Sequence, residues 1–196
     1  AEITATGGNA IYLAVDLGES GSIGKVIDTV LGEFGGIDIL INNAGLGHMA
    51  PLEEAPLEDW HHMVNVNVNG LLSCVHAALP HLIENKGNII NLASVAAHGV
   101  FPRAVVYCAT KHAVAAISKG LRLELRGRVK ITEISPGAVV TEFLEQTHHK
   151  ETKKAFKEGA FEGIVLEAID IANTILHVLS QPDHVVLSEV IIRPNQ

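Results

Sequence analysis

Short apolar runs that alternate with long amphipathic stretches constrain the fold of this chain more than any other feature. The apolar runs are typical of buried strands and cover residues 37–41, 88–93, 129–134 and 185–192. Between them, apolar residues recur at helical spacing over residues 57–84, 104–125 and 168–179. Strands that alternate with helices predict βαβ units. We therefore expect one α/β domain over residues 1–196, built on a doubly wound parallel sheet.

The first 36 residues predict one more strand and one more helix. Residues 1–6 are typical of the last turn of a helix, which Gly7-Gly8 would end. Residues 10–15 are apolar and predict a short buried strand. Glycines at positions 18, 21 and 24 do not form a dinucleotide fingerprint, which needs closely spaced glycines in the turn itself. The next helix should end at Gly35-Gly36, and its apolar face consists of Ile23, Val26, Ile27, Val30, Leu31 and Phe34.

Composition limits which binding partners and which cellular compartment we expect for this chain. Apolar residues make up 47% of the 196 positions, which is enough for a sizeable core. The net charge of −8 argues against nucleic acid as a partner. No apolar run approaches the roughly 18 residues of a membrane span, and the first residues are not a signal peptide, so we expect a cytoplasmic protein that binds no membrane. Cys74 and Cys108 should be buried free thiols rather than a disulfide or a metal pair.

Reactive side chains concentrate between Ser94 and Lys111. Tyr107 and Lys111 are four residues apart in a predicted helix, which places both on one helix face. A tyrosine with its ordinary pKa of about 10 is a poor acid or base at neutral pH. A nearby ammonium should lower that pKa. Ser94 ends a predicted strand, where ligands of parallel sheets bind, and could hydrogen-bond a substrate oxygen. The alternative for the Tyr-Lys pair alone is an ordinary solvated helix face.

Three further segments combine small and polar residues. Asn42-Asn43-Ala44-Gly45 follows the strand at 37–41, where small residues let the backbone approach a ligand and asparagines can tie neighbouring strands together. Asn67 interrupts a predicted helix, where asparagine costs stability relative to alanine, which suggests another role for it. Pro136-Gly137 follows the strand at 129–134 and should turn the chain over the sheet edge. Taken singly, the first and last of these could be plain turns.

Taken together, these segments resemble the motifs of the classical short-chain dehydrogenase/reductase family over nearly the whole chain. The resemblance implies a Rossmann-like fold and an NAD(P)-dependent oxidoreductase that interconverts an alcohol and a ketone or aldehyde. The catalytic residues that it implies are Asn67, Ser94, Tyr107 and Lys111. The cofactor-binding residues that it implies are Asp16, Leu17, Asn43, Ala44, Gly45, Tyr107, Lys111, Pro136, Gly137, Val139 and Thr141.

The resemblance also implies a role for each catalytic side chain. Ser94 would polarise the carbonyl, and Tyr107 would deliver or remove the proton. Lys111 would lower the pKa of Tyr107 and hold the nicotinamide ribose, while Asn67 would anchor a proton relay through water. The last 16 residues resemble the branch of serine 3-dehydrogenase and 3-hydroxy acid dehydrogenases, which implies NADP, with NAD as the alternative. A small alcohol or carbonyl substrate and a homodimer or homotetramer are implied in the same way.

Residues 142–163 are polar and weakly helical, which is typical of a mobile segment that covers a substrate. His148-His149 within it do not predict a metal site, because adjacent histidines on a helix point about 100° apart. The 11 histidines are also scattered along the whole chain. We therefore expect no metal. His98 is expected to be a surface loop histidine, and contact with a substrate is the alternative.

The glycine-rich phosphate turn with which the family begins is not found in this chain. On the order of 60 residues, about two βα units, are missing, and the strand at 10–15 would then lack its neighbour. Because residue 1 is Ala rather than Met, we expect a further N-terminal segment. The alternative function is a non-catalytic binding or assembly subunit with an incomplete dinucleotide site. A serine hydrolase built on Ser94 is a distant third, because no Gly-x-Ser-x-Gly motif surrounds it.

Overall fold

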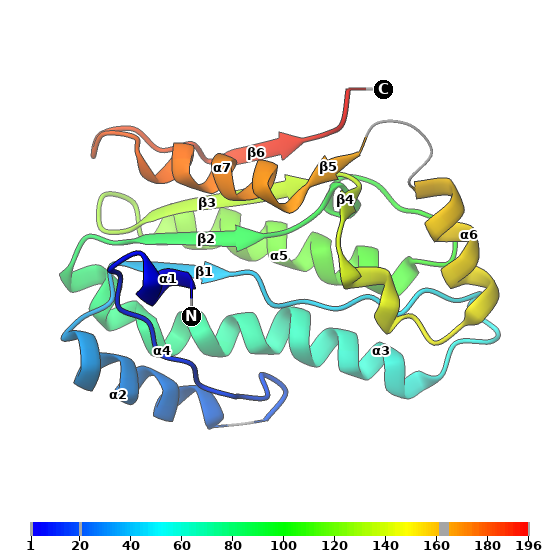
Figure 1. The fold of residues 1–196 in the computed structure, drawn as a ribbon, viewed down its shortest axis with the longest axis horizontal. Coiled ribbons are helices and arrows are strands. Elements are labelled where there is room, and N and C mark those ends of the chain that lie inside the picture. Colours follow the sequence, from blue (N-terminus) through cyan, green and yellow to red (C-terminus); the bar gives the residue numbers. More distant parts are fainter. Residues whose placement is uncertain (1, 20, 161–164, 196) are drawn as a thin grey trace.

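The computed structural model describes residues 2–19, 21–160 and 165–195, and most of its helices and strands alternate along the chain (Figure 1). Between α3 and α4 lies a π-helix, η1, whereas η2 and η3 are short 3-10 helices. The elements are α1 (Glu2–Ala5), α2 (Ser22–Phe34), β1 (Ile39–Asn42), α3 (Leu57–Val64), η1 (Asn65–Gly70), α4 (Leu71–Glu84), β2 (Asn88–Leu92), η2 (Val95–Ala97), α5 (Val105–Glu124), β3 (Lys130–Pro136), β4 (Val139–Val140), η3 (Glu142–Gln146), α6 (Lys150–Ala160), β5 (Leu166–Glu167), α7 (Ala168–Leu179) and β6 (Glu189–Ile192).

The main sheet of the described residues has the strand order β1-β2-β3-β6, and all its strands are parallel. Ile39 pairs with Asn88, which pairs in turn with Lys130, so these three strands run level with one another. β6 joins further along β3, where Glu133 pairs with Glu189. The carboxyl ends of the strands therefore meet at one edge of the sheet, which is where ligands of open α/β sheets bind.

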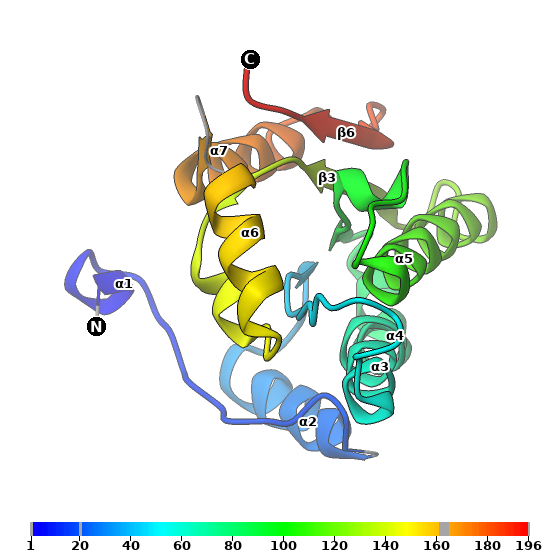
Figure 2. The same ribbon diagram turned by 90° about the vertical axis from the view of Figure 1, so that its right-hand side faces the viewer.

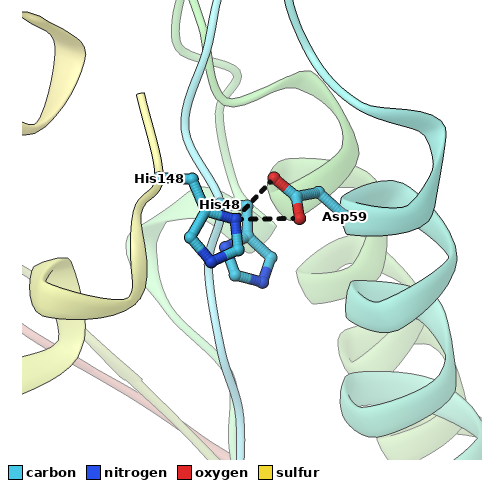
Figure 3. A group of neighbouring side chains, drawn as sticks. All are labelled: His48, Asp59 and His148. Carbon is cyan, nitrogen blue, oxygen red and sulfur yellow. Dashed lines mark hydrogen bonds and ion pairs between the residues drawn. The ribbon is translucent and has the colours of Figure 1, made fainter. Parts of the chain in front are cut away.

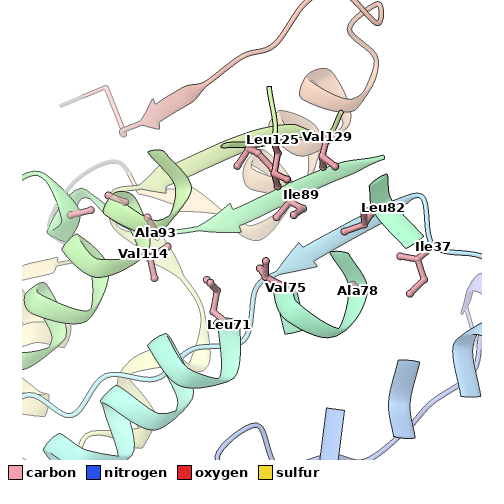
Figure 4. Close-up of a cluster of buried hydrophobic side chains, with 13 residues drawn as sticks. Ile37, Leu71, Val75, Ala78, Leu82, Ile89, Ala93, Val114, Leu125 and Val129 are labelled. Atoms are coloured by element: carbon pink, nitrogen blue, oxygen red, sulfur yellow. The ribbon is translucent and has the colours of Figure 1, made fainter. Parts of the chain in front are cut away.

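Helices cover both faces of this sheet (Figures 1 and 2). On one face, Leu82 of α4 and Val114 of α5 pack in a core cluster with Ile89 of β2 (Figure 4). On the opposite face, Val178 of α7 packs against Ile90 of β2. Successive residues of a strand point to opposite faces, so Ile89 and Ile90 pack against the helices on opposite faces of the sheet. α2 packs beside α4. This arrangement confirms the predicted doubly wound α/β fold.

The predicted strand at residues 10–15 is wrong. The segment is an irregular chain outside any sheet, and Tyr12 in it is 88% exposed. Figure 2 shows α1 and the residues after it lying apart from the packed helices. A strand needs a neighbour for its backbone N–H and C=O groups, and no strand of the described chain pairs with this segment. For the same reason β1 is only half buried, with Ile39 and Ile41 more than 40% exposed rather than buried as predicted.

One continuous helical stretch covers Leu57–Glu84, as predicted. The three asparagines in its middle coincide with the π-helix Asn65–Gly70, and such π-segments often occur at functional sites. By length and composition alone the stretch could cross a membrane, which corrects the expectation that no segment of this chain comes near that length. A single such helix is a weak indication, because core helices pass the same test. Here Leu71, Val75 and Leu82 pack into the core.

The C-terminal half follows the predicted order of elements with shifted ends. β3 extends through Pro136, and β6 begins at Glu189 instead of residue 185. The segment at residues 142–163 is helical as predicted, in the form of η3 and α6, although residues 161–163 lie outside the described residues. The short pairing of β4 with β5 was not predicted. It connects the chain leaving β3 to the chain entering α7.

Candidate active site

A cavity of about 970 Å³ lies at the carboxyl ends of the parallel strands. Gly45 lines it after β1, Ser94 after β2 and Gly137 after β3. The start of α5, the covering elements η3 and α6, and the first turns of α7 complete its walls. Its volume is in the range of pockets that hold a small ligand, about 300–1,000 Å³. The position agrees with the rule that the strand order of a parallel sheet places ligands at this edge.

Tyr107 and Ser94 meet in this cavity. Their side chains are hydrogen-bonded to each other, and this bond acts to lower the pKa of Tyr107. Ser94 is the N-cap of η2, and its Oγ accepts a hydrogen bond from the N–H of Ala96 at 3.1 Å, which fixes the hydroxyl at the strand end. Burial nevertheless raises the pKa of Tyr107 to about 12. The prediction that Lys111 lowers this pKa below its ordinary value is therefore wrong for the structure as it stands.

Lys111 lies one helical turn after Tyr107, with its Nζ 5.9 Å from the centre of the tyrosine ring. The residue is only 6% exposed, and Nζ donates a hydrogen bond to the carbonyl oxygen of Leu92 at 2.9 Å. Burial lowers the pKa of Lys111 to about 8. Desolvation disfavours the charged form of both groups and is the largest cause of both pKa shifts. At neutral pH the pair thus consists of a neutral phenol and a mostly protonated lysine.

Asn67 fixes the loop that follows β1. It is 3% exposed, and its Oδ1 accepts from the N–H of Leu46 while its Nδ2 donates to the Leu46 carbonyl oxygen, both at 2.8 Å. Nδ2 also donates to Thr110 Oγ1 at 3.1 Å, which ties the loop to α5. A Cβ added at Gly45 would lie 3.4 Å from Asn67 Oδ1 and 3.5 Å from Lys111 Nζ. Gly45 therefore keeps the space beside both side chains open to a ligand.

A buried chain of polar side chains supports the strand ends. Asn42 Nδ2 donates to Asn91 Oδ1 at 2.8 Å, and Asn91 Nδ2 donates to Ser118 Oγ at 2.8 Å. β1, β2 and α5 are thereby joined inside the core. The predicted strand-tying role of the asparagines after residues 37–41 is confirmed for Asn42. Asn91 and Ser118 were missed, although a lone amide in the apolar run at 88–93 was a usable signal, because buried polar groups need partners.

The fold brings most of the predicted site residues together. Those that line the cavity are Asn43, Gly45, Ser94, Tyr107, Lys111, Pro136, Gly137, Val139 and Thr141. Ala44 and Asn67 are adjacent to this lining without belonging to it.

Asp16 and Leu17 are not brought to the cavity. Asp16 Oδ1 accepts from the N–H of Gly18 at 2.8 Å, and Asp16 lines a second cavity of about 610 Å³ beside the start of α2. Leu17 packs against Gly70 of η1, where an added Cβ would lie only 2.8 Å from the Leu17 Cβ. A contact of either residue with a cofactor thus stays a prediction.

Sequence reasoning missed two parts of the cavity wall. Arg103 is one of two charged residues in the described lining, with Lys111, and its backbone is held in the left-handed region at φ 65°. Non-glycine residues in such conformations cluster at functional sites. Phe143 of η3 packs on Tyr107 with ring centres 5.3 Å apart, and Phe156 of α6 joins the same cluster. The covering elements therefore shield the tyrosine from water.

His98 is an exposed loop residue, as predicted, and it does not line the cavity. Its Nε2 lies 3.1 Å from Ser135 Oγ and 3.4 Å from Oε1 of Glu133, which is completely buried. Its Nδ1 lies 3.7 Å from Oε1 of Glu189. Nothing in the sequence pairs these residues, because they come from the loop after β2 and from two neighbouring strands. The two ring nitrogens of His98 thus lie beside the carboxylates of Glu133 and Glu189.

The buried Lys111 predicts an unusual pH dependence of stability. Its pKa is about 8 in the folded chain and 10.5 as the ordinary value. Between these two pH values the unfolded chain holds more protons, so the free energy of unfolding rises with pH, by about 3 kcal/mol in total. Lys111→Met should remove this rise and should be more stable than wild type at pH 7. Urea unfolding of both proteins at pH 7 and pH 10 tests this, and parallel pH dependence would contradict it.

Comparison with known proteins agrees with this geometry. The family model described as "short chain dehydrogenase" matches residues 1–152. Serine 3-dehydrogenase of Rhizobium radiobacter is 40% identical over 192 residues, which are 95% of this chain and 76% of that protein. The closed form of serine dehydrogenase complexed with NADP+ superposes with a TM-score of 0.87 at 33% identity, over 97% of this chain and 79% of that one. An alcohol dehydrogenase from the archaeon Thermococcus sibiricus, complexed with 5-hydroxy-NADP, gives a TM-score of 0.84 at 27% identity, over 98% and 78%. The chain belongs to the short-chain dehydrogenase/reductase family of NAD(P)-dependent oxidoreductases.

Proposed function

We propose that this chain interconverts an alcohol and a carbonyl compound with NADP as cofactor, and that Tyr107 is the general acid and base. The observation that carries the proposal is the meeting of Ser94, Tyr107 and Lys111 in one cavity at the strand ends. The serine dehydrogenase and the alcohol dehydrogenase that resemble this chain are both complexed with NADP or a derivative of it. We also propose the cytoplasm as its compartment.

The residues of the cavity fit a nicotinamide nucleotide. Gly45 leaves open the space beside Lys111 Nζ, so a ribose hydroxyl could approach that ammonium without a steric clash. Gly137, Ala138, Val139 and Thr141 add small side chains and backbone groups to the cavity lining. When bound, the nicotinamide gives or accepts the hydride. The residues proposed to hold it are Asn43, Ala44, Gly45, Tyr107, Lys111, Pro136, Gly137, Val139 and Thr141.

The protonation states suit a proton transfer at the substrate oxygen. Because the pKa of Tyr107 is raised to about 12, its hydroxyl is protonated at neutral pH and can donate to a carbonyl oxygen during reduction. Lys111 places a positive charge 5.9 Å from the ring, which stabilises the phenolate left behind. Ser94 accepts from the N–H of Ala96 and is hydrogen-bonded to Tyr107, so a substrate oxygen that replaces this bond would meet both hydroxyls. Asn67 acts by positioning the loop beside Lys111.

Arg103 supports a 3-hydroxy acid as the substrate class. Arg103 is an exposed residue of this mostly apolar lining, and a guanidinium binds a carboxylate through charge-assisted hydrogen bonds. The related serine 3-dehydrogenase is named for serine, which is itself a 3-hydroxy acid.

Replacement of Arg103 by Met should separate charged from neutral substrates. We expect kcat/KM for a 3-hydroxy acid to fall about 10–100-fold, which corresponds to about 1.5–3 kcal/mol for a hydrogen bond to a charged group. The value for a neutral secondary alcohol should change little, because the variant keeps an apolar side chain of similar length. Steady-state rates of both substrates with both proteins test this. Equal losses for the two substrates would rule out a role in carboxylate binding.

We further propose a homodimer or homotetramer formed through α4 and α5, as the family resemblance implies. Leu72 of α4 and Val105 of α5 are 44% and 47% exposed, which leaves apolar surface on this face of the chain. Covering such surface is favourable. A light-scattering mass of a single chain at micromolar concentration would contradict the proposal.

A further inference from the structure

A group of titratable side chains lies outside the cavity, where the chain entering α6 meets α3 (Figure 3). His48 comes from the loop after β1, Asp59 from the first turn of α3, and His148 from the segment between η3 and α6. One potential ligand atom of each lies within 4.8 Å of the others. None of the three is among the residues that line the cavity in the described part of the chain.

His48 presents a buried nitrogen that the described residues leave without a partner. The residue is 8% exposed, and its Nδ1 lies 2.8 Å from the carbonyl oxygen of Gln146. A carbonyl oxygen can only accept, so Nδ1 carries the proton and Nε2 carries a lone pair. No hydrogen-bond donor of the described residues reaches this Nε2. Metal-binding histidines have the same arrangement, with the second ring nitrogen donating to a carbonyl or carboxylate.

Asp59 and His148 add two ligands of the right chemistry. His148 Nδ1 lies 3.1 and 3.2 Å from the two carboxylate oxygens of Asp59. The imidazole of His148 stacks on that of His48, with ring centres 4.6 Å apart and an angle of 22° between the planes. Figure 3 shows the two rings stacked on each other, with the Asp59 carboxylate beside the ring of His148.

We propose that His48, Asp59 and His148 bind a divalent transition ion, with Zn²⁺ as the fitting probe. Two imidazoles and one carboxylate form a ligand set that Zn²⁺ takes in proteins, with water in the fourth position. Adjacent histidines at positions 148 and 149 predicted no metal site, but the fold supplies the other two ligands from residues about 90–100 positions away. This inference goes beyond the dehydrogenase activity and does not depend on it.

Closing the site needs a rotation of the His148 ring, because the lone pairs of two stacked imidazoles do not converge on one point. Ligands at about 2.0–2.1 Å from a tetrahedral ion lie roughly 3.3 Å from one another, compared with at most 4.8 Å here. The His148 side chain is 70% exposed and can rotate, whereas that of Asp59 is 14% exposed and is held by α3. The bound ion would thus draw the segment before α6 onto a fixed partner.

The ion would fasten the covering elements to the body of the enzyme. The same segment already makes two neighbouring contacts, from Thr147 Oγ1 to the carbonyl oxygen of Gly47 at 3.1 Å and from His149 Nε2 to Glu54 Oε2 at 2.9 Å. These contacts hold it at one end of α6, whose Phe156 reaches the cavity. Zn²⁺ should therefore stabilise the covered form of the cavity.

The test is Zn²⁺ binding to the purified, chelator-stripped full chain by isothermal titration calorimetry. We expect one saturable site per chain, and at least about tenfold weaker binding for both Asp59→Asn and His148→Ala, since even outer-sphere changes cost 10–100-fold. His149→Ala is the matched control, because it removes the neighbouring histidine of the same segment and keeps all three ligands. Co²⁺ in place of Zn²⁺ should give the visible absorption of a four-coordinate site in wild type and in His149→Ala.

Limited trypsin digestion gives a second readout that is independent of activity. Lys150, Lys153 and Lys154 stand in the first turns of α6, and Zn²⁺ should slow cleavage there in wild type but not in His148→Ala. His148 is mostly exposed, so its loss should leave the fold intact, and circular dichroism checks this. Binding of equal strength in wild type and His148→Ala, or no saturable binding by wild type, would overturn the proposal.

Discussion

Replacing Tyr107 by Phe is expected to lower kcat by about 10²–10⁴-fold, the usual contribution of a positioned acid or base. The variant keeps the ring that packs on Phe143 and loses only the hydroxyl that bonds to Ser94. The dissociation constant for NADPH, measured by fluorescence titration, should stay within a few-fold of wild type. Lost turnover with retained binding would identify the hydroxyl as the proton donor and acceptor.

The chain has its own control for this experiment. It contains two tyrosines, and the other one, Tyr12, is 88% exposed on the irregular N-terminal segment. Tyr12→Phe should leave kcat and stability unchanged. If Tyr107→Phe turned over as fast as Tyr12→Phe, the general acid and base would have to be sought elsewhere in the cavity.

Replacing His98 by Ala is expected to destabilise the fold by about 1–3 kcal/mol, the usual cost of leaving a buried polar group without a hydrogen-bond partner. Glu133 lies in the middle of β3 with no exposed surface, and its Oε2 has no hydrogen-bond partner among the described residues. His98 Nε2 and the Ser135 hydroxyl, at 3.4 and 2.7 Å, are its contacts at Oε1. Without His98, the buried carboxylate would keep only the Ser135 hydroxyl as a polar neighbour at Oε1. Urea unfolding measures the loss.

Two further variants separate the polar contact between His98 and Glu133 from the packing of the His98 ring. Glu133→Gln in the His98→Ala background should recover most of the loss, because a neutral amide costs less to bury than a carboxylate. His184→Ala, at an exposed loop position, should change stability by no more than about 0.5 kcal/mol. If the double variant were as unstable as His98→Ala alone, His98 would stabilise the fold by packing and not by its polar contact with Glu133.

The parts of the fold that depend on local pattern were predictable. The strands at 88–93 and 129–134 and the helices at 57–84, 104–125 and 168–179 all occur, because their periodicity and length specify them without a partner. The strand at 10–15 failed because strand formation depends on a neighbour, which local sequence does not report. The half-exposed β1 has the same cause.

The active-site residues that belong to a local sequence motif were predictable. Those whose neighbours come from distant parts of the sequence were not. Ser94, Tyr107 and Lys111 come together as spacing and strand position suggested. The pKa of Tyr107 moved in the opposite direction, because burial depends on Phe143 and the covering elements rather than on its own helix. Arg103, His98 and His48 acquire their roles from residues far away in sequence, so no local pattern marks them.

The most direct test of the dehydrogenase proposal is the formation of NADPH when wild-type protein is mixed with NADP+ and a panel of 3-hydroxy acids and neutral secondary alcohols. We expect saturable NADPH formation with at least one member of the panel, fastest with a 3-hydroxy acid, and its loss in Tyr107→Phe. A protein that binds NADPH saturably but forms none from any member of the panel would contradict catalysis. It would favour a non-catalytic, dinucleotide-binding member of the family.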